Sequence, residues 1–411
     1  MIMEVTRTFH PVGQGAFYTE RFYTGNGAFT IVYDCGSETL KKGKTLETRI
    51  RSTFPEGTEI DVLFISHFHD DHINGLGTLK DHCKIKRVVL PYLGKEEKVF
   101  LKAQYYLNHS SSSGFTYTEF ESFLDNPARF LGRDNEVAVI EILPIDSEGE
   151  QEPPRSHPEE AVDITEIRGE WSNGQRQREW HQGGPAFNSG TVFKFPRSYE
   201  WFFIPFNYNQ DHYSKAFKDA IEEEGLSLGE IDTIEKIMQH KDKIIKAYES
   251  SVSRDPESTN GDLNKSSMML YSGPTSEDRF HFSSFFCHRF FCLSHCRSCY
   301  HPSMYPHSGC LYTGDIRLKG NAIVKDVSNR LENFRDAIGT LQIPHHGSIR
   351  NFNKSVLELG NIYCAIFSFG SNNHYGHPSG LVISEVVEED VIPCLVTENP
   401  RSIVVQCISI R

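Results

Sequence analysis

A short segment of the chain concentrates side chains that bind metal ions. Residues 67–72 read His-Phe-His-Asp-Asp-His and supply three imidazoles and two carboxylates. They closely follow residues 61–65, an apolar run that predicts a buried β-strand. A turn from this strand into a helix lets alternate side chains converge on one point. Imidazole and carboxylate groups are ligands that suit zinc, manganese or iron. This density of ligands beside a strand favours a metal site over a polar loop that is merely rich in histidine.

The rest of the chain predicts strands with interspersed helices. Apolar and β-branched runs predict strands at residues 29–33, 61–65, 88–91, 137–143, 191–195, 201–206, 267–271 and 310–313. Apolar residues at helical spacing predict amphipathic helices at residues 99–107 and 231–248. Further strands and helices alternate at residues 341–343, 362–369, 381–388, 394–397 and 403–408. This order predicts a layered α/β domain whose active site lies at the ends of strands.

Composition excludes several classes of protein. The 411 residues include 42 Lys and Arg but 55 Asp and Glu, so the formal net charge is −13. An acidic chain does not coat itself with nucleic acid through counterion release, which disfavours a non-specific nucleic-acid scaffold. No stretch of 18 apolar residues occurs, so we expect no membrane-spanning helix. Residues 1–7 lack the apolar core of a secretory signal, and we expect a cytoplasmic protein.

Three further motifs lie elsewhere along the chain, one before and two after residues 67–72. They are Tyr33-Asp34-Cys35-Gly36, Thr313-Gly314-Asp315 and Pro344-His345-His346-Gly347-Ser348. Together with the His-x-His-x-Asp-His segment, they resemble the motifs of the metallo-β-lactamase superfamily of metal-dependent hydrolases. The resemblance implies one domain over residues 1–411 with a four-layer αββα sandwich. It also implies two insertions, a helical one at residues 145–262 and one rich in Cys and His at residues 281–307.

Two late motifs narrow the resemblance. They are Tyr375-Gly376-His377-Pro378-Ser379 and Asn264-Lys265-Ser266-Ser267. This set is similar to the soluble hydrolase domain of the bacterial competence DNA-uptake channel and to phosphocholine esterases. Those relatives act on phosphodiesters or phosphoesters, so the resemblance implies a substrate that is a nucleic acid or a small phosphodiester.

The resemblance also implies a role for each motif residue. Two divalent ions, zinc or alternatively manganese or iron, would be bound by His67, His69, Asp71, His72, Asp315 and His346. Asp315 would bridge the ions, and Asp34 would support the metal loop without binding metal. Either His345 or His346 would complete the second ion. His346 is favoured, and His345 would then face the substrate. His377 would contact the phosphate or act as general acid, although a histidine before proline is also a common turn residue. Asp71, His345 and His377 are therefore the expected catalytic residues.

One ligand position departs from the family pattern. Many members place a third histidine of the first metal between the second motif and the bridging aspartate. The candidate here is His181, in Trp180-His181-Gln182. The alternative is an ordinary loop histidine in a branch of the family that lacks this ligand.

A second group of metal-binding side chains lies in the Cys/His-rich segment. It consists of Cys287, Cys292, Cys296 and Cys299, with histidines interleaved. Four such ligands predict a structural zinc site with no open position for water. The alternative is an apolar insertion whose thiols are incidental.

These motifs predict hydrolysis by a water molecule that two metal ions activate. We expect a phosphodiester or phosphoester substrate. The alternatives are a hydrolase of carboxylic esters, lactones, thioesters or amides on the same fold, and a binding protein without enzymatic activity.

Overall fold

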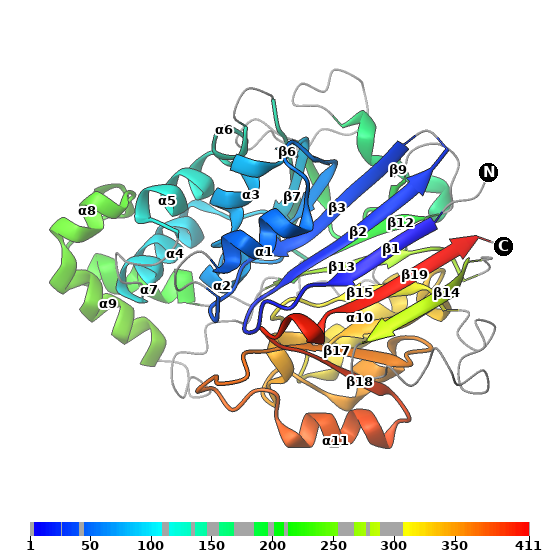
Figure 1. Cartoon of the computed structure of the whole chain (residues 1–411). Helices are drawn as coiled ribbons and strands as arrows, with labels where there is room; N and C mark the ends of the chain where they lie inside the picture. The colour runs from blue at the N-terminus through cyan, green and yellow to red at the C-terminus, as the bar shows by residue number, and fades with distance from the viewer. Residues whose placement is uncertain are drawn as a thin grey trace.

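A computed structural model of the chain describes most of its length. The described residues are 4–25, 27–40, 45–108, 115–132, 136–145, 156–167, 185–195, 201–208, 213–253, 267–276, 280–287 and 307–410. Among them, two large mixed sheets lie face to face (Figure 1).

The first sheet contains the first and the last described strand of the chain. Its strands are parallel in one half and antiparallel in the other. From β10 to β3 its strands run parallel, and from β3 to β14 they alternate in direction. In spatial order the described strands are β10 (Ala186–Asn188), β8 (Ala138–Leu143), β7 (Arg87–Pro91), β5 (Val62–Phe64), β3 (Gly27–Cys35), β2 (Phe17–Thr24), β1 (Glu4–Phe9), β19 (Val404–Ile410) and β14 (Phe280–Cys287).

The second sheet has a parallel half as well, formed by β15 to β18. In spatial order its described strands are β18 (Ile392–Val396), β17 (Cys364–Ser368), β16 (Ile338–Gln342), β15 (Gly309–Tyr312), β13 (Ser267–Gly273), β12 (Phe202–Tyr208), β11 (Phe193–Lys194) and β9 (Val162–Asp163). A separate short pair joins β4 (Glu59–Ile60) and β6 (Lys84–Ile85).

Helices cover the outer faces of both sheets. The described helices are α1 (Thr45–Thr53), α2 (Asp70–Ile73), α3 (Leu76–His82), α4 (Lys95–Asn108), α5 (Tyr117–Asp125), α6 (Pro127–Leu131), α7 (Tyr213–Glu223), α8 (Ile234–Gln239), α9 (Lys241–Ser253), α10 (Asn321–Arg330) and α11 (Gly380–Glu388). One apolar cluster joins α1 to α6 with the first sheet, and another joins α10 and α11 with the second. This arrangement confirms the expected four-layer αββα sandwich.

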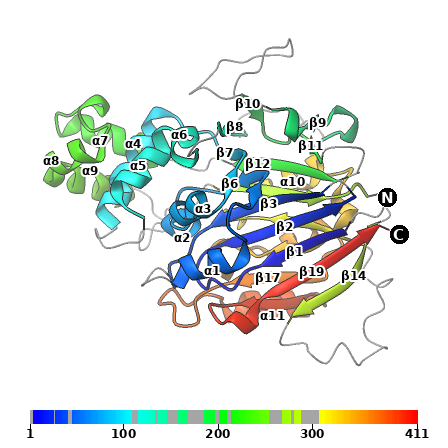
Figure 2. The ribbon, with the colours of Figure 1, turned by 45° about the horizontal axis from the view of Figure 1, so that its top comes forward.

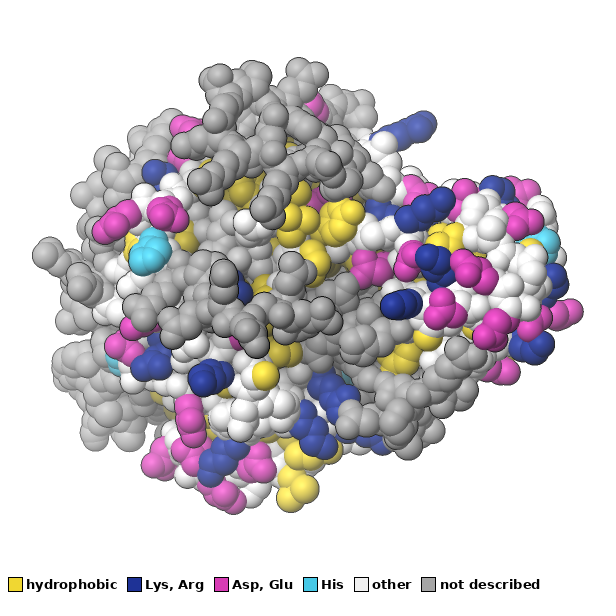
Figure 3. All heavy atoms as spheres, turned by 180° about the vertical axis from the view of Figure 1, so that it is seen from behind, with side chains coloured by type: hydrophobic (Ala, Val, Ile, Leu, Met, Phe, Trp, Pro, Cys, Tyr) yellow, Lys and Arg dark blue, Asp and Glu magenta, His cyan; other side chains and the backbone are white. Residues whose placement is uncertain are grey.

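Helices α4, α5, α7, α8 and α9 gather at one end of the molecule, on the left in Figures 1 and 2. Helices α4, α7, α8 and α9 share an apolar cluster of their own, which includes Phe100, Phe217 and Ile244. Seen from behind, the outer surface of this end mixes basic and acidic side chains (Figure 3). The described part of this surface therefore shows charges of both signs and no extended basic patch.

Most predicted elements are present, with one clear correction. The helix predicted over residues 231–248 is two helices, α8 and α9, because His240 leaves the helical conformation (φ −113°, ψ 25°). Several short strands, among them β4, β6, β9 and β10, were not predicted, because strands of two or three residues carry too little apolar pattern. Among the described residues, no helix combines the length and the hydropathy that crossing a membrane requires.

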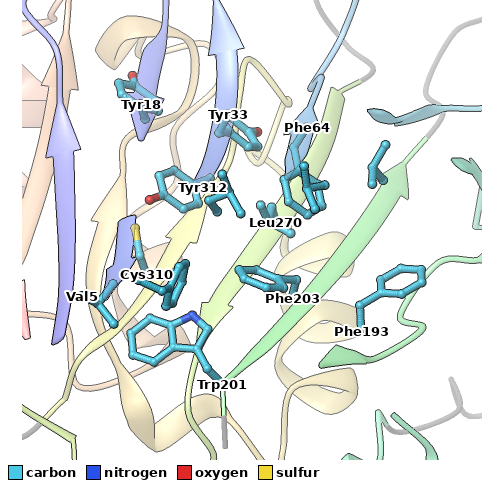
Figure 4. Close-up of a cluster of buried hydrophobic side chains, with 14 of the residues drawn as sticks. Val5, Tyr18, Tyr33, Phe64, Phe193, Trp201, Phe203, Leu270, Cys310 and Tyr312 are labelled. Atoms are coloured by element: carbon cyan, nitrogen blue, oxygen red, sulfur yellow. The ribbon is translucent and has the colours of Figure 1, made fainter. Parts of the chain in front are cut away.

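Aromatic side chains fill the space between the two sheets (Figure 4). The rings of Tyr18, Tyr33 and Tyr312 stack at centroid distances of 4.8–6.2 Å. Trp201 and Cys310 are buried nearby. These residues come from both sheets, so the contacts between them hold the sandwich together.

A buried ion pair lies inside this apolar layer. Arg7 Nε donates to Glu20 Oε1 (2.6 Å), and both side chains are fully buried. Arg7 also donates to the carbonyl oxygens of Ser308 and Ser272, while Tyr312 Oη donates to Glu20. Because every charged group has partners, the pair is tolerated inside the core.

Removing one member of this pair should destabilise the fold. We expect Arg7→Met to lower the free energy of unfolding by about 3–5 kcal/mol, because Glu20 would stay buried without its counter-charge. The matched control is Lys354→Met, which breaks a solvent-exposed pair with Glu389 and should leave the free energy of unfolding almost unchanged. Urea denaturation measures both values, and equal losses would contradict the importance of the buried pair.

Candidate metal centre

The predicted metal-binding residues follow the ends of parallel strands in both sheets. Asp34 is the penultimate residue of β3, and the segment 66–72 follows β5, which is parallel to β3. In the other sheet, Asp315 follows β15, and His346 follows the parallel strand β16. The carboxyl ends of parallel strands share one edge, so the sandwich brings these segments together.

Four side chains converge tightly at this edge. Asp71, His72, Asp315 and His346 each offer one ligand atom, and these atoms lie within 4.8 Å of one another. His72 Nε2 is 3.3 Å from Asp315 Oδ1, and His346 Nε2 is 3.2 Å from Asp71 Oδ2. Two imidazoles and two carboxylates form a donor set that suits zinc and similar divalent ions.

Two more histidines line the same centre. His67 Nε2 and His345 Nε2 each lie 3.8 Å from Asp315 Oδ2. The rings of His67 and His69 are 4.8 Å apart at their centroids. The structure therefore brings His67 and His72 to Asp315, and His69 lies beside His67.

Hydrogen bonds orient three of the imidazole rings in the same way. His72 Nδ1 donates to Asp34 Oδ2 (2.8 Å), and His346 Nδ1 donates to the carbonyl oxygen of Ser368 (2.8 Å). Ser66 Oγ donates to Asp34 Oδ2, so it accepts from His67 Nδ1 (2.9 Å). Each Nδ1 is thus engaged, and each Nε2 points toward the carboxylates, where it would bind a metal ion in its unprotonated form.

The buried charges also favour a cation at this place. Burial opposes ionisation of Asp71 and Asp315, but the neighbouring His72 and His346 lower the pKa of both carboxyl groups. Burial likewise opposes a charge on His72, yet Asp315, Asp71 and Asp34 raise its pKa well above the usual range. A proton on His72 thus balances the carboxylates in the way that a metal ion would.

The other two histidines of the motif are neutral near neutral pH. Burial and the charge of His72 lower the pKa of His67 well below its usual range. Burial lowers the pKa of His69 to about 4. A neutral imidazole is the form that binds a metal ion.

Unusual backbone conformations set the directions of several of these side chains. Asp34, His345 and His346 have φ values of 54°, 46° and 55°, which residues other than glycine rarely adopt. Consecutive positive φ angles turn His345 and His346 in different directions from one short turn. Such conformations persist only where the surrounding structure imposes them, and they are common at functional sites.

Glycine is required in the Thr-Gly-Asp turn. Gly314 has a φ of 55°, and a Cβ there would lie 2.2 Å from Ser267 Oγ and 2.9 Å from Ser66 Cβ. The turn therefore packs directly against the strand ends that carry the metal loop.

His377 lies next to the late histidine motif. Its ring centroid is 5.3 Å from that of His345 and 6.4 Å from that of His346. Burial, together with the charges of His345 and His346, lowers the pKa of His377 to about 3. Neighbouring Tyr375 is 59% exposed and donates to Glu38, so this loop forms part of the rim of the site.

The remaining predicted ligands cannot be placed against this centre. His181, Cys292, Cys296 and Cys299 lie outside the described residues. Cys287 is the last residue of β14, but its side chain is not described. A zinc site in this segment and a role for His181 stay predictions.

Several residues that orient the centre were not predicted. Ser66 links Asp34 to His67, Gln342 accepts from the backbone N–H groups of Thr313 and Gly314, and Asn351 donates to the carbonyl oxygen of Asp315. Ser66 directly precedes the first histidine, which could have been a signal. Gln342 and Asn351 carry no local signal, because the contacts they make depend on the packing of distant segments.

Comparisons with known proteins agree with the motifs. Residues 22–171 match the family model of the metallo-beta-lactamase superfamily. No curated protein matches the chain. Over these residues the chain is therefore similar to the metallo-beta-lactamase superfamily, and the metal motifs agree with this match.

Several solved structures match the chain with low sequence identity. A long form RNase Z from yeast is 9% identical with a TM-score of 0.34, and the match covers 90% of this chain and 38% of that one. The metallo-beta-lactamase fold protein YhfI from Bacillus subtilis is 15% identical with a TM-score of 0.20, covering 50% and 54%. MEM-A1, a subclass B3 metallo-beta-lactamase from a soil metagenome library, is 11% identical with a TM-score of 0.21, covering 49% and 48%. The chain thus spans less than two thirds of each of these proteins.

Removing the central carboxylate should remove metal. We expect Asp315→Ala to reduce the bound zinc or manganese to less than half of the wild-type content, because it deletes a charged ligand that four histidines surround. The matched control is Asp70→Ala, since Asp70 is also a buried carboxylate of the metal loop but accepts from Asn74 and Tyr105. Elemental analysis of both variants after purification without chelator measures the difference. Equal metal content in the two variants would contradict the site.

Proposed function

We propose that the chain is a member of the metallo-β-lactamase superfamily and a metal-dependent hydrolase of phosphodiester or phosphoester bonds. The main support for the hydrolase is the convergence of Asp71, His72, Asp315 and His346 on one point. The preference for phosphorus comes from the motifs around His345 and His377, which are similar to those of phosphodiesterases. The substrate would be a nucleic acid or a small phosphodiester.

The side chains present fit a pair of divalent ions. Asp71, His72, Asp315 and His346 would hold one ion, and His67, His69 and Asp315 would hold the other. Among the described residues, His67 Nε2 and His72 Nε2 are buried atoms without a hydrogen-bond partner, and both face Asp315. Buried polar atoms are rarely left unpaired, so these two atoms support a ligand at this place. Bound divalent ions would lower the pKa of a coordinated water molecule and stabilise negative charge on the substrate.

The protein itself supplies orientation and hydrogen bonds. Asp34 and Ser66 hold the rings of His72 and His67 so that their Nε2 atoms stay aimed at the centre. His345 Nε2 lies 3.8 Å from Asp315 Oδ2, and the His377 ring lies beside that of His345, so both would contact a phosphate bound at the centre. The free His377 ring is neutral, because its pKa is about 3, so its one N–H would donate to a phosphoryl oxygen. The negative charge of a bound phosphodiester would raise this pKa, and the protonated ring would then give a proton to the departing oxygen. We therefore assign substrate contact to His345 and His377, and metal binding to His346.

The reaction class can be tested directly. We expect the protein loaded with zinc or manganese to hydrolyse bis(4-nitrophenyl) phosphate, and expect a chelator to abolish this activity until the metal is restored. Parallel assays with 4-nitrophenyl phosphate, 4-nitrophenyl acetate, a thioester and a lactone measure the alternatives. Faster metal-dependent hydrolysis of a carbon ester than of every phosphoester would reject the phosphodiesterase and favour the second reaction class.

The role of His377 can be separated from metal binding. A positioned proton donor speeds the departure of a poor leaving group by about 10²–10⁴, but a nitrophenolate departs without it. We expect His377→Ala to slow hydrolysis of a dinucleotide far more than hydrolysis of bis(4-nitrophenyl) phosphate, with metal content unchanged. Equal losses on both substrates would instead indicate that His377 is a structural or metal-binding residue. Wild-type rates on both substrates would indicate that His377 is only a turn residue without a role in the reaction.

A further inference from the structure

We propose that the ring of Tyr375 is the surface on which a base of the substrate stacks, which rests on the phosphodiesterase function proposed above. Tyr375 is 59% exposed, more than any other aromatic residue that the structure describes. Single exposed rings are common on protein surfaces, but this one lies beside the candidate metal centre and is held in one orientation.

Two histidine rings lie between Tyr375 and the metal centre. The ring centroid of Tyr375 is 5.9 Å from that of His377, with 30° between the planes, and His377 is 5.3 Å from His345. His345 Nε2 is in turn 3.8 Å from Asp315 Oδ2. A nucleoside separates its base from its phosphate by one sugar. A phosphate that contacts His345 and His377 would therefore bring the base of its ester group within reach of Tyr375.

Hydrogen bonds hold Tyr375 at both of its ends. Its Oη donates to Glu38 Oε1 (3.0 Å), and its backbone N–H donates to Asn373 Oδ1 (3.1 Å). Asn373 also accepts from the backbone N–H of His377 (3.1 Å) and donates to the carbonyl oxygen of His377 (2.6 Å). One side chain thus fixes Tyr375 and His377 relative to each other. A ring that is already oriented loses little conformational freedom when a ligand binds, which favours affinity.

The acceptor Glu38 is also fixed. Its backbone N–H donates to the carbonyl oxygen of Gln14 (2.7 Å), and Gln14 Oε1 accepts from the backbone N–H of Gly370 (3.4 Å). Gln14 therefore connects the segment of Glu38 with the segment that leads to Tyr375. Partial burial and the charge of Glu38 raise the pKa of Tyr375 to about 12, so the phenol keeps its proton near neutral pH. The bond to Glu38 is then present under the conditions in which the protein works.

A flat aromatic base suits this ring better than other groups. Because the hydroxyl is bound to Glu38, Tyr375 offers a ligand mainly its ring face, and a base of any identity can stack on one such face. A quaternary ammonium group is usually bound by several aromatic rings together. Among the described residues, the other exposed aromatic residue is Tyr23, which pairs with Ala28 at the opposite end of β3 from Asp34. An alkyl chain would cover only part of the ring and leave much of its own surface in water.

Two substrates with the same alkoxide leaving group test this contact. They are the dinucleotide d(ApA) and its analogue whose leaving nucleoside lacks the base. We expect Tyr375→Ala to lower the ratio of kcat/KM for d(ApA) over the analogue about tenfold, because the base loses its stacking partner. A disturbance of His377 would slow both substrates alike and leave this ratio unchanged, which would contradict the proposal.

Two further variants separate the ring face from its support. Tyr375→Phe keeps the ring and removes the bond to Glu38, and it should keep most of the wild-type ratio. Tyr23→Ala is the matched control, since it removes an exposed tyrosine far from the centre, and it should keep the whole ratio. Equal losses in Tyr375→Phe and Tyr375→Ala would show that the bond to Glu38 matters and not the ring face, and would overturn the proposal.

A binding measurement separates this proposal from the proposed function. In titration calorimetry of the zinc-loaded protein, adenosine 5′-monophosphate should bind more tightly than methyl phosphate, and Tyr375→Ala should reduce this preference about tenfold. If the wild type hydrolyses d(ApA) but Tyr375→Ala keeps both the rate ratio and the binding preference, the stacking surface is wrong and the hydrolase stands. If no phosphoester is hydrolysed but the binding preference falls in Tyr375→Ala, the proposed function is wrong and the stacking surface stands. Tighter binding of phosphocholine than of adenosine 5′-monophosphate, lost in Tyr375→Ala, would overturn the base in favour of a cationic group.

Discussion

The carboxylate of Asp34 holds the metal loop in place from inside the first sheet. One oxygen accepts from the backbone N–H of Ser66, and the other accepts from Ser66 Oγ and His72 Nδ1. Burial raises the pKa of Asp34, while His72 and Ser66 offset part of this effect. The Asp34 side chain is buried and its φ is positive. Burial of a carboxylate and a positive φ both destabilise the fold at this position. Those costs are reasonable if two histidines must keep fixed ring orientations.

The relative placement of the two sheets matters equally, because each sheet carries half of the centre. The Arg7–Glu20 pair and its partners connect strands β1 and β2 of one sheet with β13 and β15 of the other. Stacked tyrosines fill the same layer. A directional network in an otherwise apolar interface restricts how the sheets can shift against each other. Asp71 and His346 can then meet although they belong to different sheets.

The local parts of this architecture were predictable and the long-range parts were not. The segment 67–72 and the strand before it can be recognised in consecutive residues, and the resemblance of the motifs to a known family implied the αββα sandwich. The sequence could not decide how His345 and His346 divide their roles, because two adjacent residues differ only in the backbone angles of a strained turn. The structure places His346 against Asp71, and metal binding by it stays a prediction. Gln342 and Asn351 were missed because their importance arises only when distant strands meet.

The division of the centre between the sheets has a consequence for the order of folding. Asp71 and His72 lie in the first fifth of the chain, whereas Asp315 and His346 lie in its last quarter. Contacts between such distant segments form slowly, because the chain loses the entropy of closing a long loop before these contacts can stabilise it. An early fragment of the chain would hold only part of the donor set and would release a metal ion easily. Firm metal binding would therefore begin only when the second sheet docks on the first, and the ion would then stabilise the completed sandwich through mass action.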